Sequence, residues 1–267
     1  MDESELQAQV SAASAYERLF VPALFGQWAR RVADTADLGP GDRVLDVACG
    51  TGVLAREAAP RITPDGSVAG LDINRGMLTV AAQLAPHIDW RHGDAGKLPF
   101  ADASFEAVIS QFGLMFFPDR SQSLREMMRV LVPDGRLAIA VFDSLENQPA
   151  YALEVELLRN TAGRDAANAL RAPFALGDRH DLAELFRSAG IIQPKITTHP
   201  GMARFQSIRS MVEADLRGWL PVMGVELAAD VIAEVLEKAE TVLNRFADPR
   251  GAIAFDLSAH IVSATKR

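Results

Sequence analysis

The sequence has one cysteine, Cys49, and no long apolar run. A single thiol cannot form an internal disulfide, which excludes the class of small proteins that disulfides hold together. No apolar stretch approaches the ~20 residues that a helix needs to cross a bilayer, and the acidic amino terminus has no apolar signal core. These absences predict a cytoplasmic protein without a membrane span.

Clustered positive charge is also missing. The formal net charge is −8, and the acidic residues are spread along the chain. Nucleic-acid binding relies on grouped Lys and Arg side chains, and the adjacent pair Arg30 and Arg31 is too short to form such a group. The sequence therefore predicts no nucleic-acid partner.

Several catalytic motifs are absent as well. No pair of histidines or acids has metal-ligand spacing, and there is no H-E-x-x-H motif, so we predict no metal site. The phosphate-binding loop of NTPases and the G-x-S-x-G elbow of α/β-hydrolases are missing too.

The 267 residues, 49% hydrophobic and 23% charged, have the ordinary composition of a globular protein with one large domain.

The most informative stretch that is present runs from Arg43 to Glu57. It reads as a buried strand, a turn that contains Gly50 and Gly52, and then a helix. This geometry lets a ligand lie against bare backbone at the positive end of the helix dipole.

The next predicted strand, over residues 66–72, ends in an acid. Asp72 lies about 20 residues beyond the glycine turn, where a carboxylate can accept hydrogen bonds from a ribose diol. A nucleoside-bearing cofactor is therefore expected. The letters from Gly50 to Ala55 also satisfy the G-x-G-x-x-G/A fingerprint, so a nicotinamide cofactor stays open at this point.

The rest of the chain alternates strands and helices, which predicts a parallel sheet with helices on both faces. Residues 1–11 are expected to be loose, and residues 12–36 to form two helical pieces interrupted at Pro22. Further strands are expected at 88–92, 105–112, 136–142, within 191–205 and over 253–261, and helices at 53–59, 74–84, 118–131, 178–189, 207–220 and 231–246.

The segments outside this alternation are predicted to cover the site. Residues 1–37 would form a helical lid, and the helical segments 144–173 and 207–247 a substrate cap. Tyr151 and Trp219 belong to the cap segments and Phe174 directly follows the first of them, and these side chains would give the pocket apolar walls. In the last strand, His260 is expected on the polar face.

Four ordered motifs carry a family resemblance. They are Val-Leu-Asp-Val-Ala-Cys-Gly-Thr-Gly at 44–52, Gly-Leu-Asp-Ile-Asn at 70–74 with Met77, Gly-Asp-Ala at 93–95 followed by Leu-Pro-Phe at 98–100, and Ser-Phe-Glu at 104–106. In these motifs the chain resembles the class I S-adenosylmethionine-dependent methyltransferases, especially the small-molecule branch of the ubiquinone/menaquinone-biosynthesis type. The resemblance is close over 43–142 and extends to the remainder only in layout.

For the fold, the resemblance implies a single methyltransferase domain over residues 1–267. Its α/β architecture would be a Rossmann-like sheet of seven strands, mostly parallel with the last strand antiparallel, and helical cap insertions.

The resemblance also implies roles at the methionine end of S-adenosylmethionine. Gly50 and Gly52, with the backbone of Ala48, would flank the methionine part. Asp46 would orient its amino group, and Gln111 would lie near the amino and sulfonium groups.

At the adenosine end, the resemblance implies that Asp72 accepts hydrogen bonds from both ribose hydroxyls. Ile73 and Met77 would pack on the adenine ring. Asp94 would accept a hydrogen bond from the adenine amino group, and Ala95 would offer its backbone N–H.

The acceptor side is less well specified by the sequence. Phe116 is a pocket candidate, and Tyr16 belongs either to the core and lid or to the cover of the cofactor. A hydroxyl or amine acceptor would benefit from a general base, for which His180 and His199 are the candidates.

The function expected from this resemblance is methyl transfer from S-adenosylmethionine to a small, fairly hydrophobic molecule, with S-adenosylhomocysteine as product. The transfer would be a direct displacement at sulfur. One alternative is a protein or cyclase that binds S-adenosylmethionine without transferring its methyl group. A second is an NAD-dependent oxidoreductase, against which Asp46 and Asp94 count.

Overall fold

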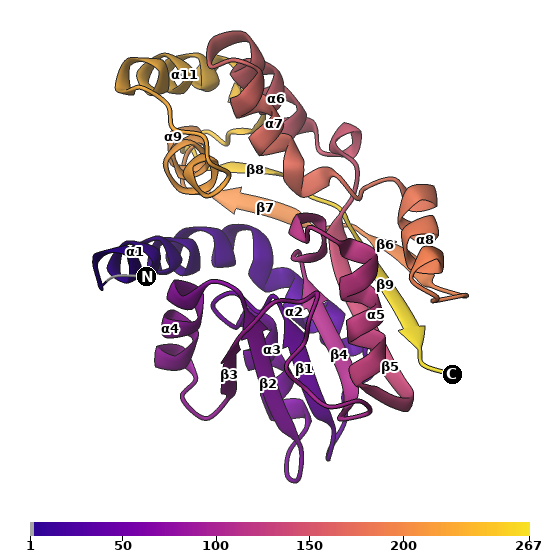
Figure 1. The fold of residues 1–267 in the computed structure, drawn as a ribbon. Helices are drawn as coiled ribbons and strands as arrows, with labels where there is room; N and C mark the ends of the chain where they lie inside the picture. Colours follow the sequence, from indigo (N-terminus) through magenta and orange to yellow (C-terminus); the bar gives the residue numbers. More distant parts are fainter. Residues whose placement is uncertain (1–2) are drawn as a thin grey trace.

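Seven strands form one sheet in the order β3-β2-β1-β4-β5-β9-β6 (Figure 1). The strands are β1 (Arg43–Val47), β2 (Ser67–Asp72), β3 (Asp89–His92), β4 (Phe105–Gln111), β5 (Leu131–Phe142), β6 (Lys195–His199) and β9 (Ala259–Thr265). Strands β1 to β5 are parallel to one another, and β9 runs antiparallel between β5 and β6. The predicted sheet, mostly parallel with an antiparallel last strand, is confirmed in this computed structural model, which describes residues 3–267.

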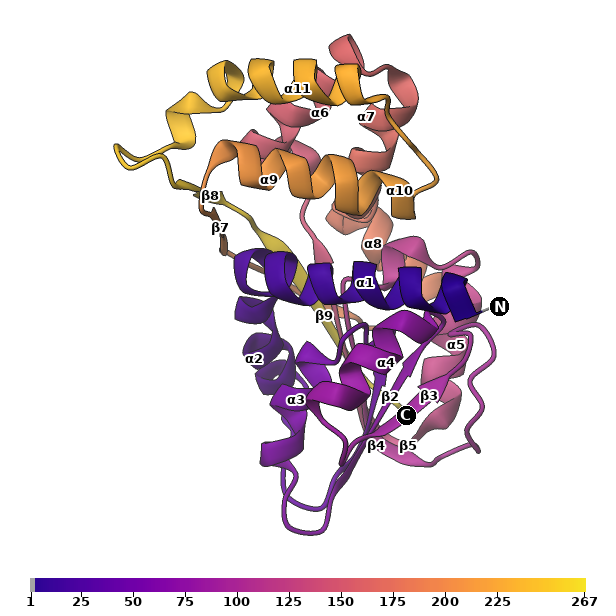
Figure 2. The ribbon, with the colours of Figure 1, turned by 90° about the vertical axis from the view of Figure 1, so that its left-hand side faces the viewer.

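The sheet is covered on both faces. Helices α2 (Gly26–Thr35) and α3 (Val53–Ala58) contact each other on one face, and α5 (Arg120–Val130) packs with α8 (Arg179–Ser188) on the other (Figure 2). Strands covered on both faces read as continuous apolar runs. Accordingly, Val44, Leu45 and Val47 of β1 are fully buried, and the turn after β1 faces the upper edge of the sheet.

The amino-terminal segment differs from the expectation. Residues 3–11 are not loose, because they belong to α1 (Glu3–Phe20), which lies along α4 (Arg75–Leu84). The two helices are so close that a Cβ on Gly76 would overlap Gln9. Residues 1–2 lie outside the described residues.

Pro22 does not interrupt the helical path. It sits in a π-helical turn, Val21–Phe25, that joins α1 directly to α2. Proline lacks an N–H but is tolerated in the first turn of a helix, which is its position here. The expected break is therefore a wide turn.

A second group of helices stands above the carboxyl ends of the strands (Figure 1). It comprises α6 (Pro149–Thr161), α7 (Arg164–Arg171), α9 (Ile208–Ala214), the π-helical turn η6 (Asp215–Trp219), α10 (Leu220–Val222) and α11 (Ala229–Val242). α11 packs on both α6 and α9. None of the helices within residues 3–267 is long and apolar enough to cross a membrane.

The end of the chain also corrects a prediction. The expected strand 253–261 is split into β8 (Ile253–Asp256), which pairs with β7 (Met202–Phe205), and β9, which enters the large sheet. The expected single strand within 191–205 is likewise two, β6 and β7. Because β9 is an internal strand, His260 is buried and not on a polar face. Its Nε2 contacts the carbonyl oxygen of Gly177 at 2.8 Å, and its Nδ1 contacts the Thr198 hydroxyl at 2.9 Å.

Candidate functional site

The turn after β1 contains an unusual run of left-handed backbone. Ala48, Gly50 and Gly52 have φ angles of 57°, 55° and 86°. Glycine adopts this region freely, whereas alanine does so only at a cost in conformational energy. At its two glycines, the turn therefore has backbone without side chains at the carboxyl edge of the sheet. Ala48, in the same turn, has a strained backbone conformation.

Asp72, at the end of β2, is tied to this turn. Its Oδ2 accepts a hydrogen bond from the N–H of Gly50 and its Oδ1 accepts one from the N–H of Asn74, both at 2.8 Å. Burial raises the pKa of Asp72, although the two N–H donors oppose the rise. Each carboxylate oxygen can accept more than one hydrogen bond, so both can still receive a hydroxyl.

Two buried oxygens beside the turn have no hydrogen-bond partner within the described part of the chain. One is Oδ1 of Asp46, whose other oxygen accepts from the N–H of Ala55 at 3.0 Å. The other is Oε1 of Gln111, whose Nε2 donates to the carbonyl of Phe25 at 3.1 Å. Burial, and to a lesser degree the charge of Asp72, raises the pKa of Asp46. Buried acceptors of this kind point to a donor that comes with a ligand.

The far side of Asp72 presents apolar surface. Ile73, directly after the buried strand β2, is 68% exposed. Asn74 caps α4, since its Oδ1 accepts the N–H of the half-buried Met77 at 3.0 Å. This surface suits the face of a flat ring.

Asp94 and Ala95 lie at the same edge, just beyond β3, which neighbours β2. Asp94 is exposed and its Oδ1 accepts from the N–H of Gly96 at 2.8 Å, whereas Ala95 is buried. The structure thus brings the predicted adenosine-side residues to one edge of the sheet.

Helix α1 closes over the turn through two neighbouring residues. Glu17 accepts hydrogen bonds from the Thr51 hydroxyl at 2.5 Å and from Arg56 Nη2 at 2.7 Å. Burial, and then the charges of Asp72, Glu17 and Asp46, raise the pKa of Tyr16. Glu17 was missed at the sequence level, because the pattern does not show where α1 docks.

We predict that Glu17→Gln loosens α1 from the turn. The variant loses the ion pair with Arg56, which is half-buried and therefore worth roughly 1 kcal/mol or less. We expect amide hydrogens of α1 to exchange up to about fivefold faster. Hydrogen exchange followed by mass spectrometry measures this, and the exposed Glu3→Gln serves as control. Equal exchange in both variants would show that Glu17 does not hold the helix.

An apolar pocket adjoins the turn and encloses about 550 Å³ of empty space, part of it open to solvent. Its lining is mostly aromatic and comes from α1, the π-turns, the end of β4 and the upper helices. The lining residues are Tyr16, Phe20, Leu24, Phe25, Phe112, Met115, Phe116, Phe142, Tyr151, Leu170, Pro173, Phe174, Asp215 and Trp219.

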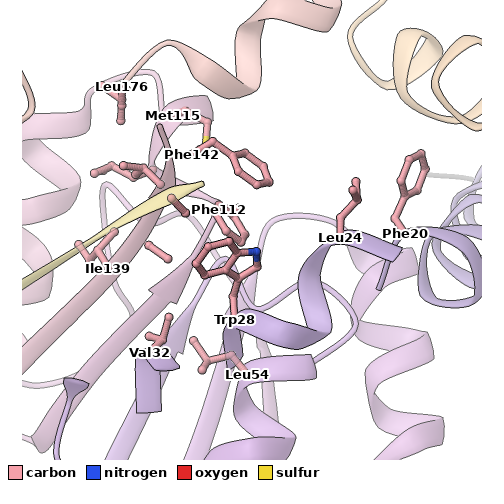
Figure 3. Packing of buried hydrophobic residues seen from close by; sticks show 14 of the residues in the cluster. Phe20, Leu24, Trp28, Val32, Leu54, Phe112, Met115, Ile139, Phe142 and Leu176 are labelled. Atoms are coloured by element: carbon pink, nitrogen blue, oxygen red, sulfur yellow. The ribbon is translucent and has the colours of Figure 1, made fainter. Parts of the chain in front are cut away.

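The pocket wall is continuous with the core of the sheet. Phe112 stacks on Phe142 with ring centroids 4.0 Å apart, and Trp28 meets Phe112 edge-on (Figure 3). Phe112 follows β4 with a φ of 57°, a second strained position at this edge. Phe116, a predicted pocket residue, lines the pocket and is 40% exposed.

The two histidines considered as bases do not line this pocket. His180 is exposed in the first turn of α8, and His199 ends β6, where burial and then Arg31 lower its pKa. The pocket instead has one carboxylic side chain in its wall, Asp215, which the sequence pattern gave no reason to select. Within residues 3–267, no group of three or more His, Cys, Asp or Glu is arranged to hold a metal ion.

The comparison with known proteins concerns the cofactor edge of the site, from Asp46 to Gln111. Residues 45–139 match the family described as a methyltransferase domain. The 2-phytyl-1,4-naphtoquinone methyltransferase of Thermosynechococcus vestitus is 41% identical over 133 residues, which are 48% of this chain and 59% of that protein. The chain spans about half the length of the curated relatives it matches. The resemblance to the small-molecule methyltransferases is confirmed.

Solved structures share the fold over most of the chain. A putative methyltransferase from Bacillus halodurans C-125 matches with a TM-score of 0.60 and 20% identity, covering 89% of this chain and 98% of its own. The [4+2]-cyclase SpnF matches with a TM-score of 0.54 and 20% identity, covering 91% and 81%. At these identities the likeness concerns the fold alone.

Proposed function

We propose that this chain, whose residues 45–139 form a methyltransferase domain, transfers a methyl group from S-adenosylmethionine to a small, hydrophobic, quinone-like acceptor. The observation that carries the proposal is the pair of unpartnered oxygens, on Asp46 and Gln111, at the edge of the sheet that also carries the glycine turn and an aromatic pocket. A ligand with an ammonium group fits the oxygens, and an apolar acceptor fits the pocket.

The residues at the edge of the sheet fit the cofactor in the following way. Asp72 would accept hydrogen bonds from the ribose hydroxyls, and Ile73 would cover a face of the adenine ring. Asp46 Oδ1 and Gln111 Oε1 would accept from the ammonium group. The remaining proposed binding residues are Tyr16, Ala48, Gly50, Gly52, Met77, Asp94, Ala95 and Phe116.

S-adenosylmethionine, when bound, supplies a methyl group on a positively charged sulfur that is a good leaving group. The chain then has to position an acceptor and exclude water, and needs little acid–base machinery for the transfer itself. Glu17 holds α1 against the turn, and the aromatic walls would exclude water around a bound acceptor. We assign residues 1–37 the role of a lid, and segments 144–173 and 207–247 the role of a substrate cap.

The acceptor class rests on two supports. The pocket walls are nearly all aromatic or aliphatic, which favours a flat apolar molecule. The relative from Thermosynechococcus vestitus acts, by its name, on a naphthoquinone. Asp215 lies outside residues 45–139, so the matched domain does not decide what the upper half of the pocket binds.

A second candidate function is a cyclase that uses this fold without methyl transfer. SpnF, a [4+2]-cyclase, shares the fold over 91% of this chain. The two functions differ in one measurable product. Transfer of labelled methyl from S-adenosylmethionine to an extracted quinol such as 1,4-naphthohydroquinone supports the methyltransferase. Cofactor binding without labelled product from a panel of quinols and phenols supports the second candidate.

The cofactor is tested first by calorimetric titration with S-adenosylmethionine, S-adenosylhomocysteine and NAD. Binding of the two sulfur nucleosides alone is expected. Binding of NAD alone would overturn the proposal and favour an oxidoreductase. Binding of none of the three would remove the cofactor assignment of the turn.

We predict that Asp72→Asn weakens S-adenosylhomocysteine binding by about 10- to 100-fold, since hydrogen bonds to a charged acceptor contribute roughly 1.5–3 kcal/mol. The exposed Asp65→Asn, in the loop before β2, is the matched control and should bind normally. The same titration measures both variants. An unchanged affinity in Asp72→Asn would contradict the ribose assignment.

A further inference from the structure

Two carboxyl groups are buried together above the pocket. Glu154 on α6 is fully buried, and Asp215 at the start of η6 is 3% exposed. Both oxygens of Glu154 and Oδ2 of Asp215 have no hydrogen-bond partner among the described residues. Buried carboxyl groups are usually paired or hydrogen-bonded, so this arrangement is costly for the chain alone.

The two groups interact electrostatically with each other and with one tyrosine. Burial raises the pKa of both acids, and the charge of Asp215 raises that of Glu154 further. Tyr151, one turn before Glu154 on α6, has its pKa raised by burial and then by both acids. No Lys, Arg or His is among the pocket-lining residues that the structure describes, so no cation from the wall neutralises the pair.

The pair reaches the pocket through Asp215. Asp215 and Tyr151 are part of the pocket wall, together with Phe112 and Tyr16. Tyr16 is close enough to Asp72 and Asp46 for their charges to act on it. One cavity therefore extends from the cofactor edge of the sheet to the buried acids of the upper helices.

We propose that Glu154 and Asp215 form a binding site for the hydroxyl or carbonyl oxygen attached to the ring of a neutral, hydroxylated aromatic molecule. Asp215 would contact this oxygen, and Glu154 would act through Asp215. This inference rests on the proposed function, because that molecule would be the acceptor. A protonated carboxyl group both donates and accepts, and it can therefore serve a hydroxyl or a carbonyl oxygen.

A neutral ligand suits the site better than an amine. An ammonium group would require one acid to ionise, and then two charges would be buried within an apolar wall, where the loss of hydration often exceeds their attraction. Aromatic faces can attract a cation, however, so an amine is the competing occupant that the experiment must separate.

The experiment compares three probes of similar shape: 1-naphthol, 1-methylnaphthalene and 1-naphthylmethylamine. Each is titrated against the purified full chain and against Asp215→Asn, Asp215→Leu and Glu154→Leu. The exposed Glu156→Gln, two residues after Glu154 on the same helix, is the matched control. Thermal unfolding and S-adenosylhomocysteine binding are measured for every variant, to show that each one folds and keeps the cofactor edge.

We expect the native chain to bind 1-naphthol about tenfold more tightly than 1-methylnaphthalene, the factor that a hydrogen bond of about average strength gives. Asp215→Leu and Glu154→Leu should remove this preference without weakening 1-methylnaphthalene, Asp215→Asn should reduce it, and Glu156→Gln should keep it. Equal binding of 1-naphthol and 1-methylnaphthalene by the native chain, or a preference that survives both leucine variants, would overturn the inference. Tightest binding of the amine would also overturn it. Absence of S-adenosylhomocysteine binding would contradict the proposed function instead, since the probe preference is measured separately.

Discussion

Gly52→Ala is expected to lower the free energy of unfolding by roughly 2–5 kcal/mol and to abolish S-adenosylhomocysteine binding. Gly52 has a φ of 86°, and left-handed backbone costs an alanine about 1–2 kcal/mol. A Cβ there would also overlap the ring of Trp90, and overpacking adds about 1–3 kcal/mol. The ring cannot easily move, because its Nε1 donates to the Ala85 carbonyl at 2.9 Å and its other atoms lie against Gly70.

The two causes can be separated by a control and a double variant. Gly41 has nearly the same φ, 87°, but open space around it, so Gly41→Ala should cost only the backbone strain. Combining Gly52→Ala with Trp90→Leu removes the ring and should give less destabilisation than the sum of the single variants, by about 1 kcal/mol or more. Denaturant unfolding measures the native chain and the four variants, including Trp90→Leu alone. Equal losses in Gly52→Ala and Gly41→Ala would show that the contact with Trp90 has no energetic role.

The cofactor edge could be predicted because its signals are local. The apolar run of β1 and the glycines after it report a strand and a turn within a few residues. Asparagine is a favoured residue at the start of a helix, and Asn74 caps α4 by accepting a hydrogen bond from the N–H of a residue three positions later. Asp72 follows from its position at a strand end, since the carboxyl ends of parallel strands meet at one edge.

Other parts could not be predicted because they depend on which distant segments meet. The pattern of residues 3–11 is weakly amphipathic, and it does not show that this part of α1 packs along α4. The alternation over 253–261 correctly indicated extended chain, yet it cannot show that the chain leaves one sheet and enters another near Leu257. His260 is buried for that reason.

Asp215 shows the same limit at the pocket. In the sequence it stands among polar and apolar residues of an ordinary amphipathic helix, and nothing nearby distinguishes it from Glu213. Its burial depends on segments that are distant in the chain, since α1 packs on the η6 turn and the charge of Asp215 acts on Tyr151 of α6. Surroundings that come from distant segments leave no signature in the sequence around the residue.

The same surroundings give the second large expected effect, which is a gain in stability. Replacing Glu154 by leucine should stabilise the ligand-free chain by about 1–4 kcal/mol at pH 8, about the range seen when a buried ion pair is replaced by apolar side chains. The variant removes two unpartnered oxygens from a fully buried position and keeps a similar volume. Glu156→Gln, on the exposed side of α6, should stay within ±0.5 kcal/mol, about the range of surface substitutions.

The gain in stability of Glu154→Leu should depend on pH, and its direction follows from the pKa of Glu154. Burial and Asp215 raise this pKa in the folded chain above the unfolded value of about 4.3, so the folded state holds the proton more firmly. The stability that the proton gives is complete below the unfolded pKa and is lost as pH rises through the folded pKa. The difference between Glu154→Leu and the native chain should therefore grow from pH 5 to pH 8, as measured by denaturant unfolding at several pH values. Parallel curves would mean that Glu154 is not protonated on folding. Suppose that the difference in free energy of unfolding between Glu154→Leu and the native chain grows with pH, and that the variant loses the preference for 1-naphthol. Glu154 would then lower the stability of the chain and contribute to ligand binding.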